Sequence, residues 1–294
     1  MRVAILGERG GWHIARLGEA LERRGHATDV VSWRSIGAAI GPGLPFVAPP
    51  QLATADVVVV RGMPGVGAAG IRLEDVIFRM DALAEGAARR TPVINPPRAL
   101  EIAIDKYLSL ALLARAGVPV PRTIIAPDAD AAREAWVTLG GDCVTKPLFG
   151  SRGRGIVRVR DAEAAAASGA AGTVYLQEFV PNGGWDLRVL VAGDETFAMR
   201  RVAAAGEWRT NVSLGGRPEP VDLPAAVVDL ARRAAACVGA VIAGVDLLPT
   251  RDGFVVLEVN GVPAWRGLQT VTATDLSATV ASVIERASGR PAAP

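Results

Sequence analysis

Short apolar segments alternate with helical patterns in the first third of the chain, and this alternation constrains the fold more than any other feature. The four apolar segments comprise residues 2–6, 28–31, 56–60 and 93–94. Short, continuous apolar runs are typical of parallel strands that are covered on both faces. Residues 14–21 and 76–88, between them, carry apolar side chains at helical spacing. This order predicts an open parallel α/β sheet, so we expect an N-terminal α/β domain over residues 1–95.

The glycine-rich segment at residues 7–11 joins the first predicted strand to the first predicted helix. It does not have the G-x-G-x-x-G spacing of a dinucleotide-binding turn. We therefore expect a simple strand-to-helix turn here, with ligand binding as the weaker alternative.

A central unit is expected over residues 96–180, after the boundary that Pro96-Pro97 marks. One helix over residues 99–115 is predicted to carry Asp105 and Lys106. The further strands and helices expected in this unit cover residues 122–126, 129–139, 143–147, 156–160, 162–171 and 174–180.

The last part of the chain, residues 181–294, is expected to form a C-terminal unit. Its pattern predicts one hairpin around Gly193-Asp194 and a second around residues 251–253. Helices are predicted over residues 225–238 and 275–287. The fold class expected for the whole chain is therefore α/β, with α+β lobes after the N-terminal sheet.

Composition excludes several classes of protein. Of the 294 residues, 50% are hydrophobic and 21% charged, and the formal net charge is +2. This balance is typical of a globular protein and argues against one that depends on attraction to a nucleic-acid backbone. Two cysteines and two histidines cannot build a disulfide scaffold or a Cys₄ zinc site. No apolar run approaches the ~20 residues of a membrane helix, so we expect a cytoplasmic protein without nucleic-acid or membrane partners.

Lysine is almost absent from this chain, although basic residues are common. Of 32 basic residues only Lys106 and Lys146 are lysines. Lys146 ends a predicted strand and precedes a loop with glycines at 150, 153 and 155, whose backbone N–H groups could approach phosphate oxygens. The loop is not a P-loop, because no Gly-Lys-Ser/Thr follows. A hairpin turn without a ligand is the alternative.

Three oxygen-bearing side chains are expected to converge on the second hairpin. Glu258 and Asn260 are two residues apart on a strand and so share a face. Asp246, on the preceding strand, falls on the same face if a bulge at Gly253 shifts the register. Oxygen ligands of this kind suit Mg²⁺ or Mn²⁺ rather than zinc. A solvated sheet face with chance acidic residues is the alternative.

Charged residues also gather on and after the first hairpin. Asp186 and Arg188 share one strand face, and Arg200-Arg201, Arg209 and Asn211 follow. Arginines beside a metal site could hold a carboxylate or a phosphate with two hydrogen bonds. Taken singly, each arginine is an ordinary surface residue.

Eight motifs in order resemble those of the ATP-grasp superfamily, over roughly residues 95 to 285. They are Asp105-Lys106, Lys146-Pro147, the loop from Gly150 to Gly155, Gln177 to Val180, Asp186-Leu-Arg188, Arg209-Thr-Asn211, Gly244-Val-Asp246 and Glu258-Val-Asn260. The chain most resembles the RimK-like α-L-glutamate ligase branch. The resemblance implies an ATP-grasp fold behind the N-terminal sheet, and it implies ATP and Mg²⁺ (or Mn²⁺) as cofactors.

The resemblance also implies a role for each matching residue. Lys106 and Lys146 would contact the phosphates of ATP. A lid over those phosphates would be formed by Gly150, Ser151, Arg152, Gly153 and Gly155. The adenine pocket would be lined by Gln177, Glu178, Phe179 and Val180, with Asp186 reaching toward the ribose. The metal ligands would be Asp246, Glu258 and Asn260. The groups facing the γ-phosphate and the acceptor carboxylate would be Arg188, Asn211 and Arg209.

The implied reaction is the ATP-dependent joining of a carboxylate and an amine through an acylphosphate, with release of ADP. We expect L-glutamate to be added to a small-molecule, cofactor-type acceptor; modification of a protein C-terminus, or a regulatory role without catalysis, is the alternative. The chain departs from the ribosomal-protein branch after Asn260, where Trp265 and Arg266 are expected, with Arg200, to lie near the acceptor. Packing is the alternative role for Trp265. Small-molecule carboxylate and amino-acid substrates are the expected partners, within a homo-oligomer (dimer or tetramer).

Overall fold

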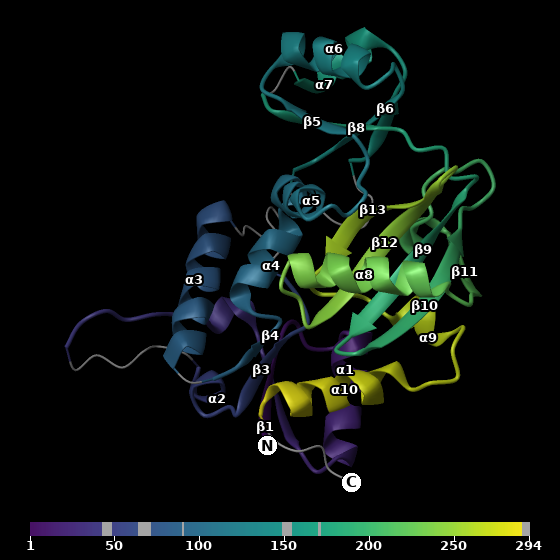
Figure 1. Ribbon diagram of the computed structural model, residues 1–294. Helices are drawn as coiled ribbons and strands as arrows, with labels where there is room; N and C mark the ends of the chain where they lie inside the picture. The colour runs from purple at the N-terminus through teal and green to yellow at the C-terminus, as the bar shows by residue number, and fades with distance from the viewer. Residues whose placement is uncertain (43–48, 64–71, 90, 149–154, 170–171, 290–294) are drawn as a thin grey trace.

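The computed structural model describes residues 1–42, 49–63, 72–89, 91–148, 155–169 and 172–289, which form three β-sheets with helices on their faces (Figure 1). The sheets follow one another along the chain. In Figure 1 the second sheet and its two helices form a lobe at the top, and the third sheet lies below it. This is the mixed α/β class expected from the sequence.

The first sheet has four parallel strands in the order β2-β1-β3-β4. Its elements are β1 (Arg2–Leu6), α1 (Trp12–Arg23), β2 (Ala27–Val31), a 3₁₀ turn (Trp33–Ser35), α2 (Pro50–Ala53), β3 (Val57–Val60), α3 (Leu73–Arg89) and β4 (Val93–Ile94). Val57 and Val59 pack in a cluster with α1, whereas Val58 and Val60 pack with residues of α3. Because both faces are covered, the strand is apolar at every position, and the predicted open parallel sheet is confirmed.

The second sheet has four antiparallel strands in the order β5-β8-β6-β7. Its elements are β5 (Thr123–Ala126), α6 (Ala129–Thr138), β6 (Cys143–Lys146), β7 (Val157–Val159), α7 (Ala162–Gly169) and β8 (Val174–Glu178). Helices α6 and α7 lie together on one face, where small residues such as Ala132 and Ala165 allow close packing (Figure 1). Lys146, at the end of β6, belongs to the site described below.

The third sheet has five antiparallel strands in the order β11-β10-β9-β12-β13. Its elements are β9 (Trp185–Ala192), β10 (Glu195–Val202), a 3₁₀ turn (Val212–Leu214), β11 (Arg217–Pro220), α8 (Ala225–Cys237), β12 (Ile242–Thr250), β13 (Gly253–Asn260), α9 (Arg266–Gln269) and α10 (Leu276–Ala287). Both predicted hairpins, β9–β10 and β12–β13, are confirmed. The sequence reading did not identify β11, and it did not predict that β9 pairs with β12.

Alternation along β9 separates the two faces of the third sheet. Leu187 and Val189 face α8, whereas Leu190 and Ala192 pack in the cluster that contains α10. Asp186 and Arg188 share the α10 side with Leu190 and Ala192, since side chains two residues apart point the same way. A polar section therefore interrupts this otherwise apolar face.

The predicted single helix over residues 99–115 is wrong, because the chain forms two helices here. Helix α4 (Pro97–Ile104) ends at Asp105 and α5 (Lys106–Arg115) begins directly after it. The Asp105 side chain accepts hydrogen bonds from the backbone N–H groups of Tyr107 and Leu108, both at 2.9 Å. An N-cap of this kind starts a new helix, and it makes Lys106 the first residue of α5.

Asn95 connects the first sheet to the third. Its Nδ2 donates to the carbonyl groups of Ile242 (2.6 Å) and Gly261 (2.5 Å), and its Oδ1 accepts from the N–H groups of Val241 and Ile242. The side chain is 2% exposed, so water cannot replace these partners.

The division into residues 1–95, 96–180 and 181–294 stays a prediction. Helix α10, from the last segment, packs on α1 of the first (Figure 1). Glu285 of α10 is buried and binds Arg24 and His26, each at 2.6 Å. The two ends of the chain therefore share one core.

Replacement of Asn95 by alanine should lower the free energy of unfolding by about 1–3 kcal/mol, because buried backbone groups of β12 lose their partners. Chemical denaturation would measure the change. Gln51→Ala, at an exposed position of α2, is the control and should change it by less than about 0.5 kcal/mol. Equal stability of Asn95→Ala and the native protein would contradict this role.

Candidate active site

Strand register places three oxygen-bearing side chains on one face of the third sheet. Asp246 pairs directly with Glu258, and Gly244 pairs with Asn260. Residues paired directly across antiparallel strands project to the same side. The bulge, however, is not at Gly253, which pairs with Thr250; the register shifts at Leu257, between Val256 and Glu258. Asp246, Glu258 and Asn260 therefore share one face as expected, but the bulge that aligns them is at Leu257 and not at Gly253.

Both lysines converge on this face from other elements. Lys146, at the end of β6, donates from Nζ to Oε1 of Gln177 at 2.7 Å, and Lys106 donates to the carbonyl oxygen of Leu148 at 3.3 Å. Burial is the main cause that lowers the pKa of Lys146 to about 8; the carboxylate of Glu258 opposes this shift, and the Lys106 ammonium contributes to it. Burial also lowers the pKa of Lys106, again opposed by Glu258. Two cations from separate elements thus lie within electrostatic reach of one carboxylate.

A buried cluster of ion pairs lies beside these groups. Arg188 binds Asp246 through Nε and Nη2, the second contact being 2.8 Å. Arg201 binds Asp186 at 2.5 and 2.7 Å and reaches Asp246 at 3.2 Å. Thr210 completes the cluster, since its hydroxyl donates to Asp186 at 2.5 Å. The neighbouring arginines hold the pKa of Asp246 below its usual value, against the effect of burial.

The sequence reading grouped Arg201 with Arg200 as an arginine near the metal site but assigned a place beside the acceptor to Arg200 alone. A two-residue turn at Gly193-Asp194 pairs Arg201 with Asp186, so the hairpin register could have identified it. Arg200 points to the opposite face, where its guanidinium lies 4.7 Å from the ring centroid of Trp185 and 4.0 Å from Glu219. Arg200 therefore does not share the sheet face of Asp186, because alternate residues of a strand face opposite ways, and its expected place beside the acceptor stays a prediction.

Asp186 and Trp265 also lie where their expected roles do not fit. Asp186 is 1% exposed and its carboxylate is held by Arg201 and Thr210, so it does not reach out toward a ribose. Trp265 is fully buried, and its indole N–H donates to Ser277 at 3.2 Å. The packing alternative for Trp265 is thus the one the structure supports, whereas Arg266 is exposed.

The residues at the end of β8 line the approach to Lys146. Gln177 is buried and donates to Thr123 and Tyr175 at 3.0 and 2.9 Å. The ring centroids of Phe179 and Trp208 are 5.6 Å apart. This contact joins the segment after β8 of the second sheet to the segment after β10 of the third sheet. Glu178 accepts from the N–H of Arg122 at 2.9 Å.

The roles expected for these residues in adenine binding, and for Val180 beside them, stay predictions. The lid residues Gly150, Ser151, Arg152 and Gly153 lie outside the described residues. Gly155 is described: it is exposed and has a φ of 69°, in the region that favours glycine.

The segment 209–211 is anchored at its centre. Thr210 binds Asp186, and the two predicted residues Arg209 and Asn211 flank it. Arg209 pairs with Glu207 at 2.6 Å, and Asn211 is half-buried. Their contacts with a phosphate or a carboxylate stay predictions.

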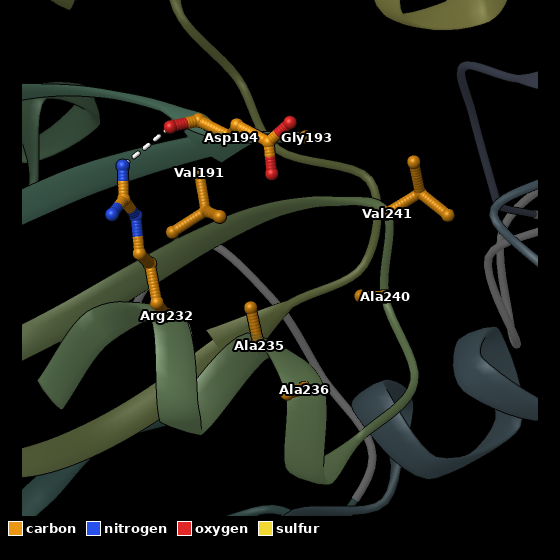
Figure 2. Close-up of a pocket in the computed structure, with 8 residues that line it drawn as sticks. All are labelled: Val191, Gly193, Asp194, Arg232, Ala235, Ala236, Ala240 and Val241. Atoms are coloured by element: carbon orange, nitrogen blue, oxygen red, sulfur yellow. Dashed lines mark hydrogen bonds between the residues drawn. The ribbon is translucent and has the colours of Figure 1, made fainter. Parts of the chain in front are cut away.

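Two cavities in the described part of the chain differ in their position relative to the predicted site residues. One, of about 400 Å³, is lined by Asp105, Tyr107, Ile125 and Leu148, next to Lys106. The other, of about 340 Å³, lies between α8 and the ends of β9 and β12 (Figure 2). Figure 2 shows Arg232 donating to the backbone oxygen of Asp194 there. No predicted site residue lines this second cavity, so we assign no role to it.

Comparison with known proteins agrees with the geometry of the site, because the matching proteins are ATP-grasp ligases. The profile described as the RimK-like ATP-grasp domain matches residues 103–284. Tetrahydromethanopterin:α-L-glutamate ligase of Methanosarcina acetivorans is 35% identical over 251 residues, which cover 74% of this chain and 76% of the relative. A probable α-L-glutamate ligase of Serratia proteamaculans is 32% identical over 302 residues, covering 99% and 97%.

Solved structures of ATP-grasp ligases share the fold. The ligase PsnB complexed with a minimal precursor has a TM-score of 0.75 and 26% identity, covering 97% of this chain and 98% of PsnB. A RimK domain ATP-grasp protein from Sphaerobacter thermophilus has a TM-score of 0.70 and 25% identity, covering 97% and 99%.

The fold and the site define the class as an ATP-grasp ligase. Within that class, the chain belongs to the RimK-like ATP-grasp family, and it is an enzyme of the kind that forms C–N bonds. The ATP-grasp fold implies binding of ATP and Mg²⁺, and PsnB has been solved with Mg and ADP. Among the described residues, no helix is long and apolar enough to cross a membrane.

Arg201→Met should lower the free energy of unfolding by about 3–5 kcal/mol, because it leaves the carboxylates of Asp186 and Asp246 buried with fewer partners. Arg200→Met is the matched control, since Arg200 is partly exposed on the other face; we expect a change below about 1 kcal/mol. Chemical denaturation distinguishes the two, and equal losses would refute the assignment.

ATP binding should weaken as the pH rises through the pKa of Lys146. That pKa is about 8, so the amine loses its charge above this value and no longer attracts phosphate. We expect up to about a tenfold loss of affinity between about pH 7 and about pH 9, measured by calorimetric titration. In Lys146→Arg the guanidinium stays protonated, so its binding should change less over the same range. Identical profiles for both proteins would argue against this cause.

Proposed function

We propose that this enzyme adds L-glutamate to a small-molecule, cofactor-type acceptor, using ATP to activate the acceptor carboxylate. The observation that supports the ATP-dependent step most directly is the convergence of Lys106 and Lys146 on Glu258. Relatives named as α-L-glutamate ligases support glutamate as the amino acid.

The two lysines are suited to hold the phosphates of ATP. Each offers a compact ammonium charge, and both are partly withdrawn from water, where charge interactions are stronger. An incoming phosphate would place negative charge against these two ammonium groups, whose charged form burial disfavours. The free energy gained when a phosphate binds these lysines would therefore exceed the gain at an exposed lysine.

Arg188 still has donors for a transferring phosphate, although it binds Asp246. The two contacts with Asp246 use Nε and Nη2, which leaves Nη1. Nη1 lies beside Gly244, where an added Cβ would be only 3.0 Å away. Because Gly244 has no side chain, Nη1 of Arg188 has room at this position.

The donor set fits a hard divalent cation. Asn260 donates from Nδ2 to the carbonyl oxygen of Gly244 at 3.1 Å, which leaves its Oδ1 to coordinate. Asp246 accepts two N–H groups from Arg188 and lies 3.2 Å from Nη2 of Arg201, so of about four acceptor positions on a carboxylate roughly one or two are left. With Glu258, these side chains would hold Mg²⁺ through oxygen atoms. Bound Mg²⁺ supplies positive charge that stabilises the phosphates of ATP.

The chemistry proceeds in two steps. A carboxylate oxygen attacks the γ-phosphorus, the bond from that phosphorus to the bridging oxygen breaks, and ADP leaves. The amine nitrogen then attacks the acyl carbon, the bond to the phosphate oxygen breaks, and the amine loses a proton as phosphate departs. Neither step needs a covalent protein nucleophile, since positioning and charge neutralisation lower both barriers. Lys106, Lys146 and Arg188 supply these effects here.

A peptide acceptor is the second candidate. PsnB, which resembles this chain over nearly its whole length, has been solved with a minimal precursor. The small-molecule proposal is supported instead by the 35% identity to a ligase named for tetrahydromethanopterin, and by the balanced net charge of +2.

The test is product analysis by mass spectrometry. The enzyme, ATP, Mg²⁺ and L-glutamate are incubated with small metabolites from a strain that lacks the gene, and in parallel with its ribosomal proteins. We expect metabolites heavier by whole glutamyl residues, with an equal amount of ADP. Additions only to protein would favour the second candidate. ATP consumption that requires neither an acid nor an amine would contradict both.

Glu258→Gln should reduce ligase turnover by at least about 100-fold, because the variant loses a charged metal ligand; even outer-shell partners of metal ligands typically contribute 10–100-fold. Glu219→Gln is the matched control on β11 of the same sheet, where the carboxylate faces Arg217 and Arg200, and its turnover should stay near the native value. Initial rates of ADP release measured across a range of Mg²⁺ concentrations compare the two. A Glu258→Gln enzyme as active as the control would exclude this carboxylate from the site.

A further inference from the structure

Arg61, just after β3, is a cation without an anionic partner among the described residues. Its guanidinium carbon lies 4.2 Å from the ring centroid of Trp265, and Nη2 donates to the carbonyl oxygen of Pro263 at 2.7 Å. The Nε atom is buried and has no hydrogen-bond partner, and no carboxylate pairs with this side chain in the part of the chain that the structure describes. Burial lowers the pKa of Arg61 to about 9, which leaves it charged at neutral pH. A half-buried cation whose Nε lacks a hydrogen-bond partner is costly unless a ligand pairs with it.

Arg266 adds a second positive charge nearby. Its backbone N–H and that of Trp265 both donate to Nε2 of His13, at 3.2 and 3.0 Å. Because Nε2 accepts both bonds, the proton of the neutral ring is on Nδ1. Burial is the main cause that lowers the pKa of His13 to about 4, and the charges of Arg61 and Arg266 contribute to this shift. Both charges that act on this histidine are cationic, so the local potential is positive.

The N-terminus of α1 faces the same region. The helix begins at Trp12, after a glycine cap that supplies no side-chain hydrogen bond, and its first turn has no acidic residue. The free N–H groups at such an end favour an anion. Arg61 follows β3, and this turn follows β1, so both lie at the carboxyl edge of the parallel sheet. This edge is where ligands bind in open α/β sheets.

Pro263 connects this region to the proposed active site. Its carbonyl oxygen accepts a hydrogen bond from Arg61. A Cβ added to Gly244 would lie 3.0 Å from the Cβ of Pro263 and also 3.0 Å from Nη1 of Arg188. Arg61 and Arg188 therefore approach the same short segment. A substrate held at Arg61 would lie next to the groups proposed to act on phosphate.

We propose that Arg61 and Arg266, with the N-terminus of α1, bind a carboxylate group of an amino-acid-type substrate. This inference rests on the proposed ligase function, and it assigns the carboxyl edge of the N-terminal sheet to substrate recognition. The carboxylate comes from L-glutamate or from an acceptor that ends in glutamate. The glycine-rich turn at residues 7–11, expected to be a simple connection, thus also borders a binding site.

Calorimetric titration of the full chain with L-glutamate and with L-glutamyl-L-glutamate tests the proposal. Arg61→Met keeps an apolar stem against Trp265 but removes the charge, so we expect about 10- to 100-fold weaker binding of whichever probe uses the site. Arg34→Met makes the same change at an exposed arginine in the 3₁₀ turn after β2 and should bind like the native protein. The probe that loses affinity identifies the source of the carboxylate.

Arg266→Gln is the second variant, since its exposed position should not disturb folding. We expect weaker binding of the same probe, with ATP affinity unchanged in both variants. Native affinity for both probes in both variants, or no binding of either probe to the native protein, overturns the proposal. Absence of ATP binding in the native protein would instead contradict the proposed ligase function, and the glutamate titration would still report on this site.

Discussion

Two buried carboxylates paired with two arginines organise the polar face of the third sheet, and the proposed active site depends on this pairing. Arg201 bridges Asp186 and Asp246, and Arg188 holds Asp246 from the neighbouring strand. Charges withdrawn from water are tolerated only when their partners are in place, so the cluster keeps each group in one orientation. Asp246 is thereby fixed beside Glu258, with part of its coordinating capacity still available.

The site is assembled from elements that are far apart along the chain. Lys146 comes from the second sheet, Lys106 from the start of α5, and Glu258 from the last strand of the third sheet. The contact between Phe179 and Trp208 connects two of these parts. Each part supplies a different charge, which suits a reaction in which a triphosphate must be neutralised and a carboxylate placed against it. The N-terminal sheet adds a further part to this arrangement, since Arg61 and Arg266 place two more positive charges at its edge.

Much of the site could be predicted from residue type and spacing, but the direction of several side chains could not. The scarcity of lysine identified Lys106 and Lys146, and the two-residue spacing of Glu258 and Asn260 placed them on one face. The place beside the acceptor was assigned to Arg200 and not to Arg201, although neighbouring arginines are equivalent until a strand register is assigned. Asp105 was placed inside a helix, since the apolar pattern continues across it, but its side chain caps a new one.

The sequence by itself determined the N-terminal parallel sheet, most strands of the later units, the two hairpins and the family, because apolar periodicity, turn residues and ordered motifs are local properties of the chain. Only the tertiary structure decided that β9 pairs with β12, that Trp265 is buried, and that Arg61 has no anionic partner within the described parts of the chain. These features depend on which distant segments meet. Burial and charge pairing are set by neighbours in space, and the spacing of residues along one chain does not specify those neighbours.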